Sequence, residues 1–390
     1  MKILSVSPLP PHPGGSAVSC ALLLGGFAAA GHTVRVLSPL AAGSPDGDAF
    51  AAAHPQIEVT RFAVPFAELS PNLPAGDDYR HTESRQIRAL LPELIRRQRP
   101  DLLFLGRETF AHDALDIARA HGVPCVLRIA GAMTLGILHG TLPERTVRHL
   151  IEQFRHAALI ICPAEHLAAR LRPFGLPPIR VIRNAVDTSH FAPAPKPAAL
   201  LRRWNIDERD VVVAHASNLK TLKRPLDVVD AAALALPRDT RLRYLVIGHG
   251  PTRQAMEDAC RARGIAAAFR FTGWIGQEQM PDYLNLADII AMPAEDETQA
   301  RVYLETQACG RVLLASDIAA AREVVVDGDS GVLFRKGDVA DLVDKTLRLA
   351  REPATRIRIG RNARARVAVH ALPAVVRDYL DALASVGPAA

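Results

Sequence analysis

Short apolar runs alternate with helical segments along almost the whole chain, and this series occurs twice. The runs of the first series are 2–8, 32–39, 101–106, 124–131, 159–164 and 180–186; those of the second are 211–217, 243–250, 269–274, 288–294, 311–317 and 330–334. Near-continuous apolar runs separated by amphipathic helices are typical of parallel β-sheets covered by helices on both faces. The sequence therefore predicts an α/β protein with two such sheets in tandem.

A proline-rich stretch at 191–200 separates the two series and marks the expected domain boundary. At 390 residues the chain is longer than an ordinary single domain, which has about 100–150 residues. Hydrophobic residues make up 49% of the chain, which excludes a disordered protein. We expect one domain at 1–188 and a second at 189–365, and from about residue 353 the sequence has helical periodicity.

The cysteines and the first residues indicate a cytoplasmic protein. The five cysteines are odd in number and widely scattered, so neither a disulfide framework nor a Cys-x-x-Cys metal site is predicted. The apolar run at the start is broken by prolines and resembles a buried strand more than a signal peptide. No stretch has the roughly 18 uninterrupted apolar residues of a membrane span.

The formal net charge of +6 suggests three classes of anionic partner, namely nucleic acid, anionic lipid and phosphorylated substrates. No zinc finger, RNA-binding strand signature or interleaved aromatic residues are present, so no nucleic-acid partner is expected. The segment 83–100 is basic and amphipathic, which allows peripheral contact with the inner face of a membrane. An ordinary solvated helix is the favoured interpretation of that segment.

Ligands of open parallel sheets bind beyond the carboxyl ends of the strands, so the loops that follow strands are the expected place for chemistry. After the first apolar run, Gly14 and Gly15 precede a helix that is expected to begin near Ser16. Paired glycines at a helix N-terminus let an anion or a sugar hydroxyl approach the free N–H groups. A plain turn is an equal alternative, and the spacing is not that of a dinucleotide-binding loop.

The loop 215–229 follows an apolar run and brings several polar and cationic residues together before a helix. They are Asn218, Lys220, Lys223 and Arg224. Such cations suit a diphosphate leaving group, because the charge that develops on its oxygens must be neutralised. Solvated surface lysines are the alternative for this loop taken alone.

The segment 293–310 follows another apolar run and contains Glu297 and Glu305 with seven residues between them. If a helix begins just after Glu297, Glu305 lies in its second turn and the amides before it are open to hydroxyl groups. A carboxylate accepts two hydroxyl hydrogen bonds, which suits the diol of a ribose or a hexose. Two glutamates at this spacing also occur often by chance.

In their order and spacing these segments resemble the retaining glycosyltransferases of the GT-B fold, family 4, over essentially the whole chain. The resemblance is carried by Gly14-Gly15 and by the segments 181–191, 217–224, 245–251, 271–294, 297–310 and 322–334. It implies two Rossmann-like domains facing across a cleft. The first domain would bind the acceptor, the second the nucleotide sugar, and a last segment, 366–390, would return to the first domain with Tyr379 and Leu380 at the crossing.

The resemblance also implies roles for particular residues. Lys223 matches the lysine at the donor diphosphate, and Asn218 stands where many members have a second cation, an arginine. Glu297 matches the glutamate that faces the transferred sugar, and Glu305 the one that holds the ribose. The further residues expected to line the donor are Gly14, Gly15, Gly248, Gly250, Gly273, Trp274, Thr298, Gln299 and Ala300.

The chain departs from the family pattern in its expected sugar and acceptor pocket. Many members carry a histidine where this chain has Ala130, and the substitutes considered are His12, His139 and Arg128, each of which suits a structural role better. The Gly-Phe-Gly that usually follows the first glutamate is replaced by 298–300. The next residue, Arg301, would meet an anionic donor or acceptor group, or else lie on the helix surface.

No metal or other cofactor is expected. Two Asp-Gly-Asp sequences, at 46–48 and 327–329, resemble metal-binding pairs, but both lie in turn-like sequence where Asp and Gly are common. In this fold the lysine and the helix amides do the work that a divalent ion would otherwise do.

The expected function is transfer of a hexose or N-acetylhexosamine from a nucleoside diphosphate sugar to a hydroxyl acceptor, with retention of anomeric configuration. UDP is the first nucleotide expected, then GDP and ADP, and the acceptor is a small molecule, a saccharide or a lipid. The alternatives are a GT-B protein that binds nucleotide sugars without catalysis, a nucleotide-sugar 2-epimerase and a phosphorylase. The first is motivated by Ala130 and Asn218. The second needs a different acid–base set and the third a pyridoxal phosphate lysine, and neither pattern is found.

Overall fold

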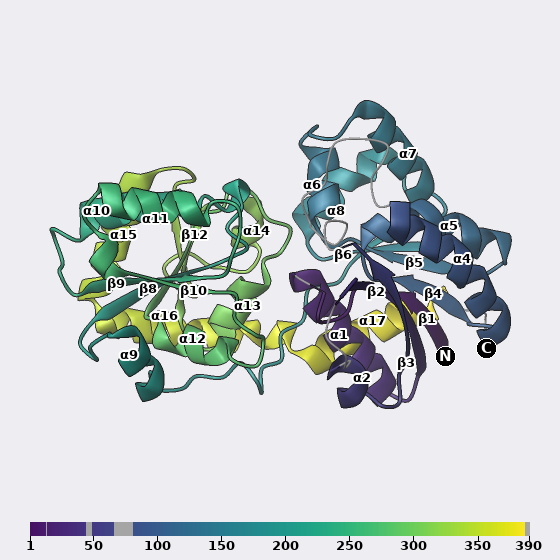
Figure 1. Cartoon of the computed structure of the whole chain (residues 1–390), viewed down its shortest axis with the longest axis horizontal. Helices are drawn as coiled ribbons and strands as arrows, with labels where there is room; N and C mark the ends of the chain where they lie inside the picture. Colours follow the sequence, from purple (N-terminus) through teal and green to yellow (C-terminus); the bar gives the residue numbers. More distant parts are fainter. Residues whose placement is uncertain (13, 44–48, 66–80, 387–390) are drawn as a thin grey trace. The chain divides into compact units, whose positions relative to one another are not determined.

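The computed structural model describes residues 1–12, 14–43, 49–65 and 81–386. The chain forms two compact units. Unit 1 comprises Met1–Ala185 and Leu372–Ala390, and unit 2 comprises Val186–Ala371 (Figure 1). Each unit is a parallel sheet covered by helices, as the alternating sequence pattern predicts, and the expected α/β fold class is confirmed.

The sheet of unit 1 has seven parallel strands in the order β3-β2-β1-β4-β5-β6-β7. They are β1 (Lys2–Val6), β2 (Thr33–Ala41), β3 (Glu58–Val64), β4 (Leu102–Leu105), β5 (Cys125–Arg128), β6 (Leu159–Cys162) and β7 (Ile179–Val181). Six of them coincide with the apolar runs of the first series. The seventh, β3, was missed because it is an edge strand in which five of seven residues are half-exposed or exposed, which leaves it without a continuous apolar run.

Helices cover both faces of this sheet. They are α1 (Gly15–Ala29), α2 (Ala49–Ala53), α4 (His81–Gln98), α5 (Ala111–Ala120), α6 (Ala132–Leu138), α7 (Glu144–Phe154), α8 (Glu165–Leu171) and α17 (Leu372–Ala384). Helices α1 and α17 pack together against one face, and α4, α5 and α7 lie together on the other (Figure 1). The face under α1 and α17 holds an apolar core cluster of unit 1.

The last helix, α17, is part of unit 1 although it follows unit 2 in sequence. Tyr379 is 1% exposed, and its ring centroid lies 6.1 Å from that of Phe27 and 6.2 Å from that of Phe104. Val376 packs so closely on α1 that a Cβ added to Gly26 would lie 2.4 Å from Val376 Cγ2. The chain end therefore completes the core of unit 1.

Helix α4 contains most of the basic amphipathic segment 83–100. Its apolar side chains, Ile87, Leu91, Leu94 and Ile95, are buried inside unit 1. The face that a membrane-docking helix would insert into lipid is thus taken up by the protein core. Among the described residues, no helix combines the length and the apolar character needed to cross a bilayer.

The sheet of unit 2 has six parallel strands in the order β10-β9-β8-β11-β12-β13. They are β8 (Val211–Ala216), β9 (Leu242–Ile247), β10 (Phe269–Gly273), β11 (Ile289–Met292), β12 (Val312–Ser316) and β13 (Val332–Phe334), and all six match the second series of runs. The helices are α9 (Ala198–Trp204), α10 (Pro225–Ala235), α11 (Arg253–Ala262), α12 (Met280–Leu286), α13 (Arg301–Ala308), α14 (Ala319–Arg322), α15 (Val339–Arg351) and α16 (Pro353–Arg366).

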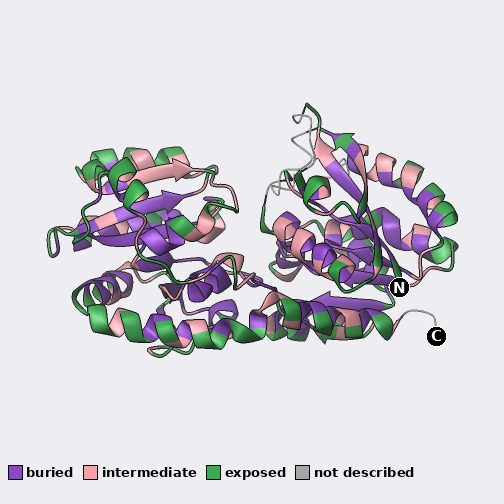
Figure 2. Ribbon diagram, turned by 90° about the horizontal axis from the view of Figure 1, so that it is seen from below, coloured by how far each residue is buried: buried purple, intermediate pink, exposed green. Residues whose placement is uncertain are grey.

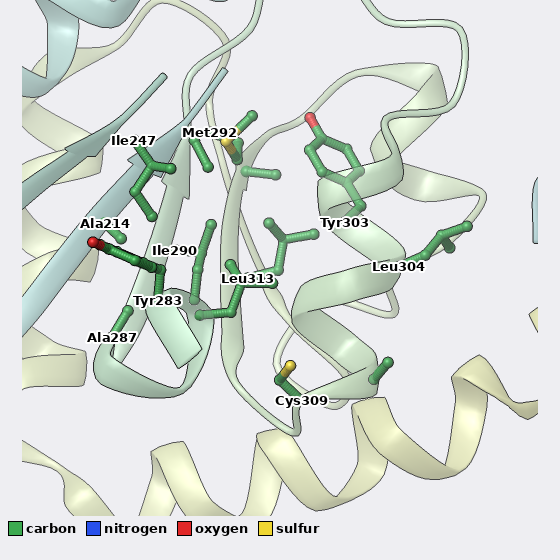
Figure 3. Close-up of a cluster of buried hydrophobic side chains, with 14 of the residues drawn as sticks. Ala214, Ile247, Tyr283, Ala287, Ile290, Met292, Tyr303, Leu304, Cys309 and Leu313 are labelled. Atoms are coloured by element: carbon green, nitrogen blue, oxygen red, sulfur yellow. The ribbon is translucent and has the colours of Figure 1, made fainter. Parts of the chain in front are cut away.

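Both faces of the unit 2 sheet are buried, which explains its uninterrupted apolar strands. Val212 and Ala214 of β8 belong to one core cluster, and Val211 and Val213 belong to another on the opposite face. Figure 3 shows the first cluster, in which Tyr283 of α12 and Tyr303 of α13 lie against the strands. In Figure 2 the helices bury one side and expose the other, as amphipathic covering helices do.

Each sheet reverses its strand order at one point, between β1 and β4 in unit 1 and between β8 and β11 in unit 2. Ligands of doubly wound sheets bind beyond the carboxyl ends of the strands at such a switch point. In unit 2 the loops at this position are 217–224, after β8, and 293–300, after β11. These are two of the loops whose sequences predicted chemistry.

Candidate functional site

Lys223 and Glu297 meet at the switch point of unit 2. They lie 74 residues apart in sequence, yet Lys223 Nζ donates a short hydrogen bond to Glu297 Oε1. The side chains are 18% and 7% exposed, so the ion pair is largely withdrawn from water. The loops after β8 and β11 are also joined through their backbones, because Glu295 N donates to Leu222 O at 2.8 Å. The fold therefore brings together two residues that the sequence predicted separately.

The loop after β8 is held in an unusual backbone conformation. Leu219 and Arg224 both have positive φ values, 44° and 47°, which side-chain-bearing residues rarely adopt. Ser217 Oγ accepts from Leu219 N at 3.0 Å, and Thr252 Oγ1 donates to Leu219 O at 2.6 Å. These contacts fix the path of the chain between β8 and α10, and so fix the position of Lys223.

Two glycines after β9 are required by close approach of this loop. A Cβ on Gly248 would lie 1.9 Å from Ser217 O, and a Cβ on Gly250 would lie 1.8 Å from Asn218 O. Gly248 N also donates to Gly273 O at 2.8 Å, so the loops after β8, β9 and β10 form one packed edge. Gly248, Gly250 and Gly273, predicted to line the donor, are brought together here, and the asparagine, Asn218, is exposed at the same edge.

Burial keeps a histidine neutral directly below this loop. His215 is fully buried at the end of β8, with its Nδ1 2.9 Å from Ala291 O and its Nε2 2.8 Å from Ser217 Oγ. Burial lowers the pKa of His215 to about 4, and the positive charge of Lys223 acts in the same direction. In the neutral imidazole Nδ1 donates to Ala291 O and Nε2 accepts from the Ser217 hydroxyl, so the ring links β8, β11 and the loop.

A second lysine contributes positive charge beside Lys223. Burial and then the charge of Lys223 lower the pKa of Lys220 below its usual value. Within the described part of the chain no acidic side chain pairs with Lys220. Two ammonium groups near one edge favour an anionic ligand.

Arg224 has acidic partners and is not part of this cationic edge. Its guanidinium donates to Asp227 at 2.8 Å and to Glu295 at 3.2 Å. Lys336 also pairs with Glu295 at 2.9 Å, and this hydrogen bond is the main cause of a lowered Glu295 pKa. Arg224 thus anchors the start of α10.

Glu305 lies in the second turn of α13, as predicted, but the helix begins at Arg301 and not just after Glu297. Thr298, Gln299 and Ala300 therefore lie in a loop that precedes the helix, and Thr298 and Gln299 are buried. Glu297 lies four residues before the helix, in the loop after β11, where its carboxylate meets Lys223. The expected contacts of residues 298–300 with a donor stay predictions.

Two side chains hold the Glu305 carboxylate. Arg301 Nη2 donates to Glu305 Oε1 at 2.8 Å, and Gln277 Nε2 donates to the same oxygen at 3.0 Å. The Arg301 and Glu305 side chains are 9% and 6% exposed, so the alternative of Arg301 as a helix-surface residue is wrong. Gln277, from the loop after β10, was not singled out in the sequence.

An exposed aromatic ring stands beside Gly273. Trp274 is 73% exposed, the most exposed of the large hydrophobic side chains in the described residues. Gly273 has a φ of 75°, which turns the chain sharply after β10 and directs the following residue away from the sheet. This loop is the one in which the sequence predicted contacts with a nucleotide base.

In unit 1 the predicted residues at the end of β1 are partly buried. Gly14 and Gly15 are exposed at the start of α1, with no atom within 4 Å of a Cβ placed on Gly14. His12 is 6% exposed, and its Nε2 lies 3.3 Å from Arg107 Nη1. Arg107 also donates to Glu83 Oε2 at 3.2 Å, which makes His12 part of a buried polar cluster.

Arg128 has a structural role at the end of β5. The residue is 2% exposed. Its guanidinium donates to Tyr379 Oη at 3.2 Å, to Gly106 O at 3.1 Å and to Asn184 Oδ1 at 2.8 Å. These bonds join β4, β5, the end of the 1–185 segment and α17. A contact of Arg128 or His12 with an acceptor stays a prediction.

Glu108 binds the backbone at Ala130, the position where many family members carry the histidine. Its carboxylate accepts from Ala130 N at 2.7 Å, Gly131 N at 3.0 Å and Thr134 N at 3.3 Å, and the residue is 1% exposed. The carboxylate thus caps the start of α6. Sequence reasoning missed Glu108, although its place directly after β4 could have signalled it. His139 is exposed at the other end of α6.

Of the two Asp-Gly-Asp sequences, the structure describes one, at 327–329, and that one is not part of a metal-binding group. Asp46 and Asp48 lie outside the described residues. Asp327 accepts from Leu333 N at 2.8 Å and Asp329 from Asn362 Nδ2 at 2.7 Å, so both carboxylates have partners within the protein. Across the described ranges, no three His, Cys, Asp or Glu side chains are grouped so as to hold a metal ion.

Two family models match the chain, one for each unit. The model described as Glycosyltransferase Family 4 matches residues 13–190, and the model described as Glycosyl transferases group 1 matches residues 198–366. Among curated proteins, a D-inositol 3-phosphate glycosyltransferase from Frankia alni is 31% identical over 68% of this chain and 70% of its own length. The Alpha-D-kanosaminyltransferase of Streptomyces kanamyceticus is 28% identical over 63% of this chain and 66% of its own length.

Solved structures share the fold at low sequence identity. HepE (Alr3699) from Anabaena, in complex with UDP and glucose, superposes with a TM-score of 0.80 at 18% identity and covers 99% of this chain and 100% of its own. Sucrose-phosphate synthase from Thermosynechococcus elongatus gives 0.82 at 16% identity, with 98% of each chain covered. These matches identify the GT-B fold.

The fold and the matched models define a glycosyltransferase of the GT-B class, and the chain belongs to glycosyltransferase family 4. The resemblance inferred from the motif series is therefore confirmed. For several of the curated relatives the match spans only about half to two thirds of their length, for example 55% of a D-inositol 3-phosphate glycosyltransferase from Streptomyces bingchenggensis.

Proposed function

We propose that this protein is a retaining glycosyltransferase that moves a hexose or N-acetylhexosamine from a nucleoside diphosphate sugar to a hydroxyl acceptor. UDP is the first nucleotide proposed for the donor. The observation that carries the proposal is the contact between Lys223 and Glu297 at the switch point of unit 2. A cation and a carboxylate side by side suit a ligand whose anionic diphosphate is joined to a sugar with free hydroxyls. The lysine would neutralise the diphosphate and the carboxylate would accept from the sugar.

The chemistry follows from these two roles. The bond between the anomeric carbon and the diphosphate oxygen breaks, and Lys223 Nζ stabilises the charge that develops on the leaving oxygen. The acceptor hydroxyl forms the new bond on the same face of the sugar, and its proton passes to a diphosphate oxygen. Glu297 holds the sugar hydroxyls while the ring approaches an oxocarbenium ion. Retention results because the bond forms on the face from which the leaving group departs.

The nucleotide would lie across the remaining loops of unit 2. Glu305 would accept from the ribose, and the loop with Gly273 and Trp274 would contact the base. Lys220 would add a second positive charge near the diphosphate, where many family members have an arginine in place of Asn218. With two lysines at this edge, we propose that the reaction needs no divalent metal.

Names of the relatives support a sugar nucleotide as donor. One solved structure of the same fold contains UDP and glucose, and one relative is named for transfer of kanosamine. We propose that unit 1 supplies the acceptor-binding residues, and that Gly14 and Gly15 line the donor. The acceptor class stays open among small molecules, saccharides and lipids.

A binding experiment tests this proposal. Thermal unfolding would be measured with UDP, GDP, ADP and their sugar conjugates in the presence of EDTA, because a ligand that binds only the native state raises the unfolding temperature. We expect one nucleoside diphosphate to raise the unfolding temperature of the wild-type protein and to leave that of Lys223→Met unchanged. If no nucleotide raises it, the donor site proposed in unit 2 is wrong. If a nucleotide binds but no sugar is transferred or hydrolysed, the protein binds nucleotide sugars without catalysis.

A further inference from the structure

The carboxylate of Glu305 is held on one oxygen only. Oε1 accepts from Arg301 Nη2 at 2.8 Å and from Gln277 Nε2 at 3.0 Å. In the part of the chain that the structure describes, no hydrogen bond to Oε2 is formed. The two oxygens of this carboxylate therefore differ in what they can still accept.

The difference matters because each carboxylate oxygen has two lone pairs. Two donors occupy those of Oε1, one of them a guanidinium that forms a charge-assisted bond. A vicinal diol bound by an unoccupied carboxylate can give one hydroxyl to each oxygen. With both lone pairs of Oε1 taken up by the protein, only Oε2 is left for a ligand. A diol that seats one hydroxyl on Oε2 in this side-by-side geometry has its second hydroxyl opposite the occupied Oε1.

The two donors come from different parts of unit 2. Arg301 is the first residue of α13 and reaches Glu305 one turn later on the same helix. Gln277 lies in the loop that follows β10 and Trp274, and its backbone oxygen is 3.0 Å from His190 Nε2. Glu305 is thus tied both to its own helix and to the loop proposed to contact the base.

Burial makes this arrangement rigid. The Arg301 and Glu305 side chains are 9% and 6% exposed, so their ion pair is little screened by water. A largely buried carboxylate with two donors has little freedom to rotate and to exchange its oxygens. The choice of oxygen offered to a ligand is therefore set by the protein before the ligand arrives.

We infer that Arg301 and Gln277 are positioning residues that make Glu305 read one ribose hydroxyl through Oε2, not both hydroxyls of the diol. This inference rests on the proposed function, since it takes Glu305 to be the carboxylate that meets the ribose. It makes Arg301 a determinant of nucleotide recognition and not a contact for an anionic sugar or acceptor. The consequence is an unequal dependence on the two ribose hydroxyls.

The first test uses the unmodified protein. Dissociation constants would be measured by calorimetry for UDP, 2′-deoxy-UDP and 3′-deoxy-UDP. We expect one deoxy analogue to bind within about twofold of UDP and the other to bind about tenfold more weakly, the effect of one lost hydrogen bond to a charged group. Equal weakening by both deletions, or weakening by neither, would overturn the inference.

The second test asks whether Arg301 acts through Glu305. Arg301→Leu should weaken UDP binding by about tenfold, Arg301→Lys should recover part of the loss, and Gln277→Ala should weaken it by a smaller factor. In the background of Glu305→Gln, adding Arg301→Leu should change UDP binding by less than about twofold, because the residue to be positioned is already altered. With the donor sugar, KM should rise while kcat changes little, since the ribose is remote from the breaking bond.

Matched controls separate positioning from a general loss of structure. Arg322→Leu breaks an exposed pair with Asp317, and Gln254→Ala breaks an exposed contact with Asp258, both in unit 2. Neither should change UDP binding. Additive losses in the Arg301→Leu, Glu305→Gln pair would reject the positioning role while leaving the proposed function intact. If UDP, GDP and ADP all fail to bind wild type, the proposed function fails and the inference with it.

Discussion

Replacing Lys223 by Met should separate the stability of unit 2 from its catalysis. The substitution keeps a long unbranched side chain and removes the charge, so Glu297, whose side chain is 7% exposed, loses the ion pair with Lys223. Breaking one side of a buried ion pair costs about 3–5 kcal/mol. Because Lys223 is 18% exposed and water can reach the pair in part, we expect the lower end, about 3 kcal/mol.

The expected loss can be measured on unit 2 alone. The two tryptophans of the chain, Trp204 and Trp274, both belong to this unit, so their fluorescence follows its unfolding and not that of unit 1. For a unit of this size, about 3 kcal/mol corresponds to a fall in Tm of about 6–12 °C. Activity should fall by about 100- to 1000-fold, as when a transition-state charge contact is removed.

A second substitution supplies the control. In Lys223→Met, Glu297→Gln both charges of the ion pair are removed, so most of the lost stability should return while activity stays low. Lys220→Met, beside it in sequence and without an acidic partner among the described residues, should change Tm by less than about 2 °C. If Lys223→Met unfolds at the wild-type temperature, or if the double variant is no more stable than the single one, the ion pair does not have the role assigned to it.

Three further predictions concern the supporting structure. His215 has a pKa of about 4 in the native protein against 6.5 when exposed, so the unfolded chain binds the extra proton first as pH falls. Wild type should therefore lose about 2 kcal/mol of stability between pH 7 and pH 5 relative to His215→Gln, measured by urea unfolding, and equal losses would contradict this. Tyr379→Phe removes the hydroxyl that accepts from Arg128 Nε and should cost unit 1 about 1–2 kcal/mol of stability. The loss should be seen as faster hydrogen exchange in β4 and β5, and unchanged exchange would count against the anchoring role. Gly250→Ala places a Cβ 1.8 Å from Asn218 O, so it should cost about 1–3 kcal/mol of stability and weaken nucleotide binding. Gly264→Ala, with open space around the added Cβ, should leave binding unchanged. Equal binding by both variants would refute the close approach.

The strands were predictable from sequence because burial on both faces leaves little choice of residue. All six strands of unit 2 coincide with predicted apolar runs to within one residue, as β8 illustrates with every residue from Val211 to Ala216 buried. β3 lies at a sheet edge, where Thr60 and Arg61 are tolerated, and its pattern carries no such signal. The other edge strands, β7, β10 and β13, do coincide with apolar runs, so the partial exposure of β3 and not its edge position alone removed the signal.

The site was predictable where it follows strands and not where it depends on loop geometry. Lys223 and Glu297 each follow a strand at the switch point, and the topology alone brings their loops together. Gln277 and Glu108 are polar residues in short connections, and nothing in their spacing shows which atoms they reach. The pairing of Arg301 with Glu305 was within reach of sequence reasoning, since residues four apart on a helix are neighbours.

Turnover of a nucleotide sugar tests the central claim most directly. Purified protein with EDTA would be incubated with UDP-hexoses and UDP-N-acetylhexosamines, and the released UDP and the first-formed anomer would be followed by proton NMR. The account predicts release of UDP without metal, an α-configured product from an α-configured donor, and loss of both in Lys223→Met. A β-configured product, or turnover that appears only when a divalent metal is added, would contradict it.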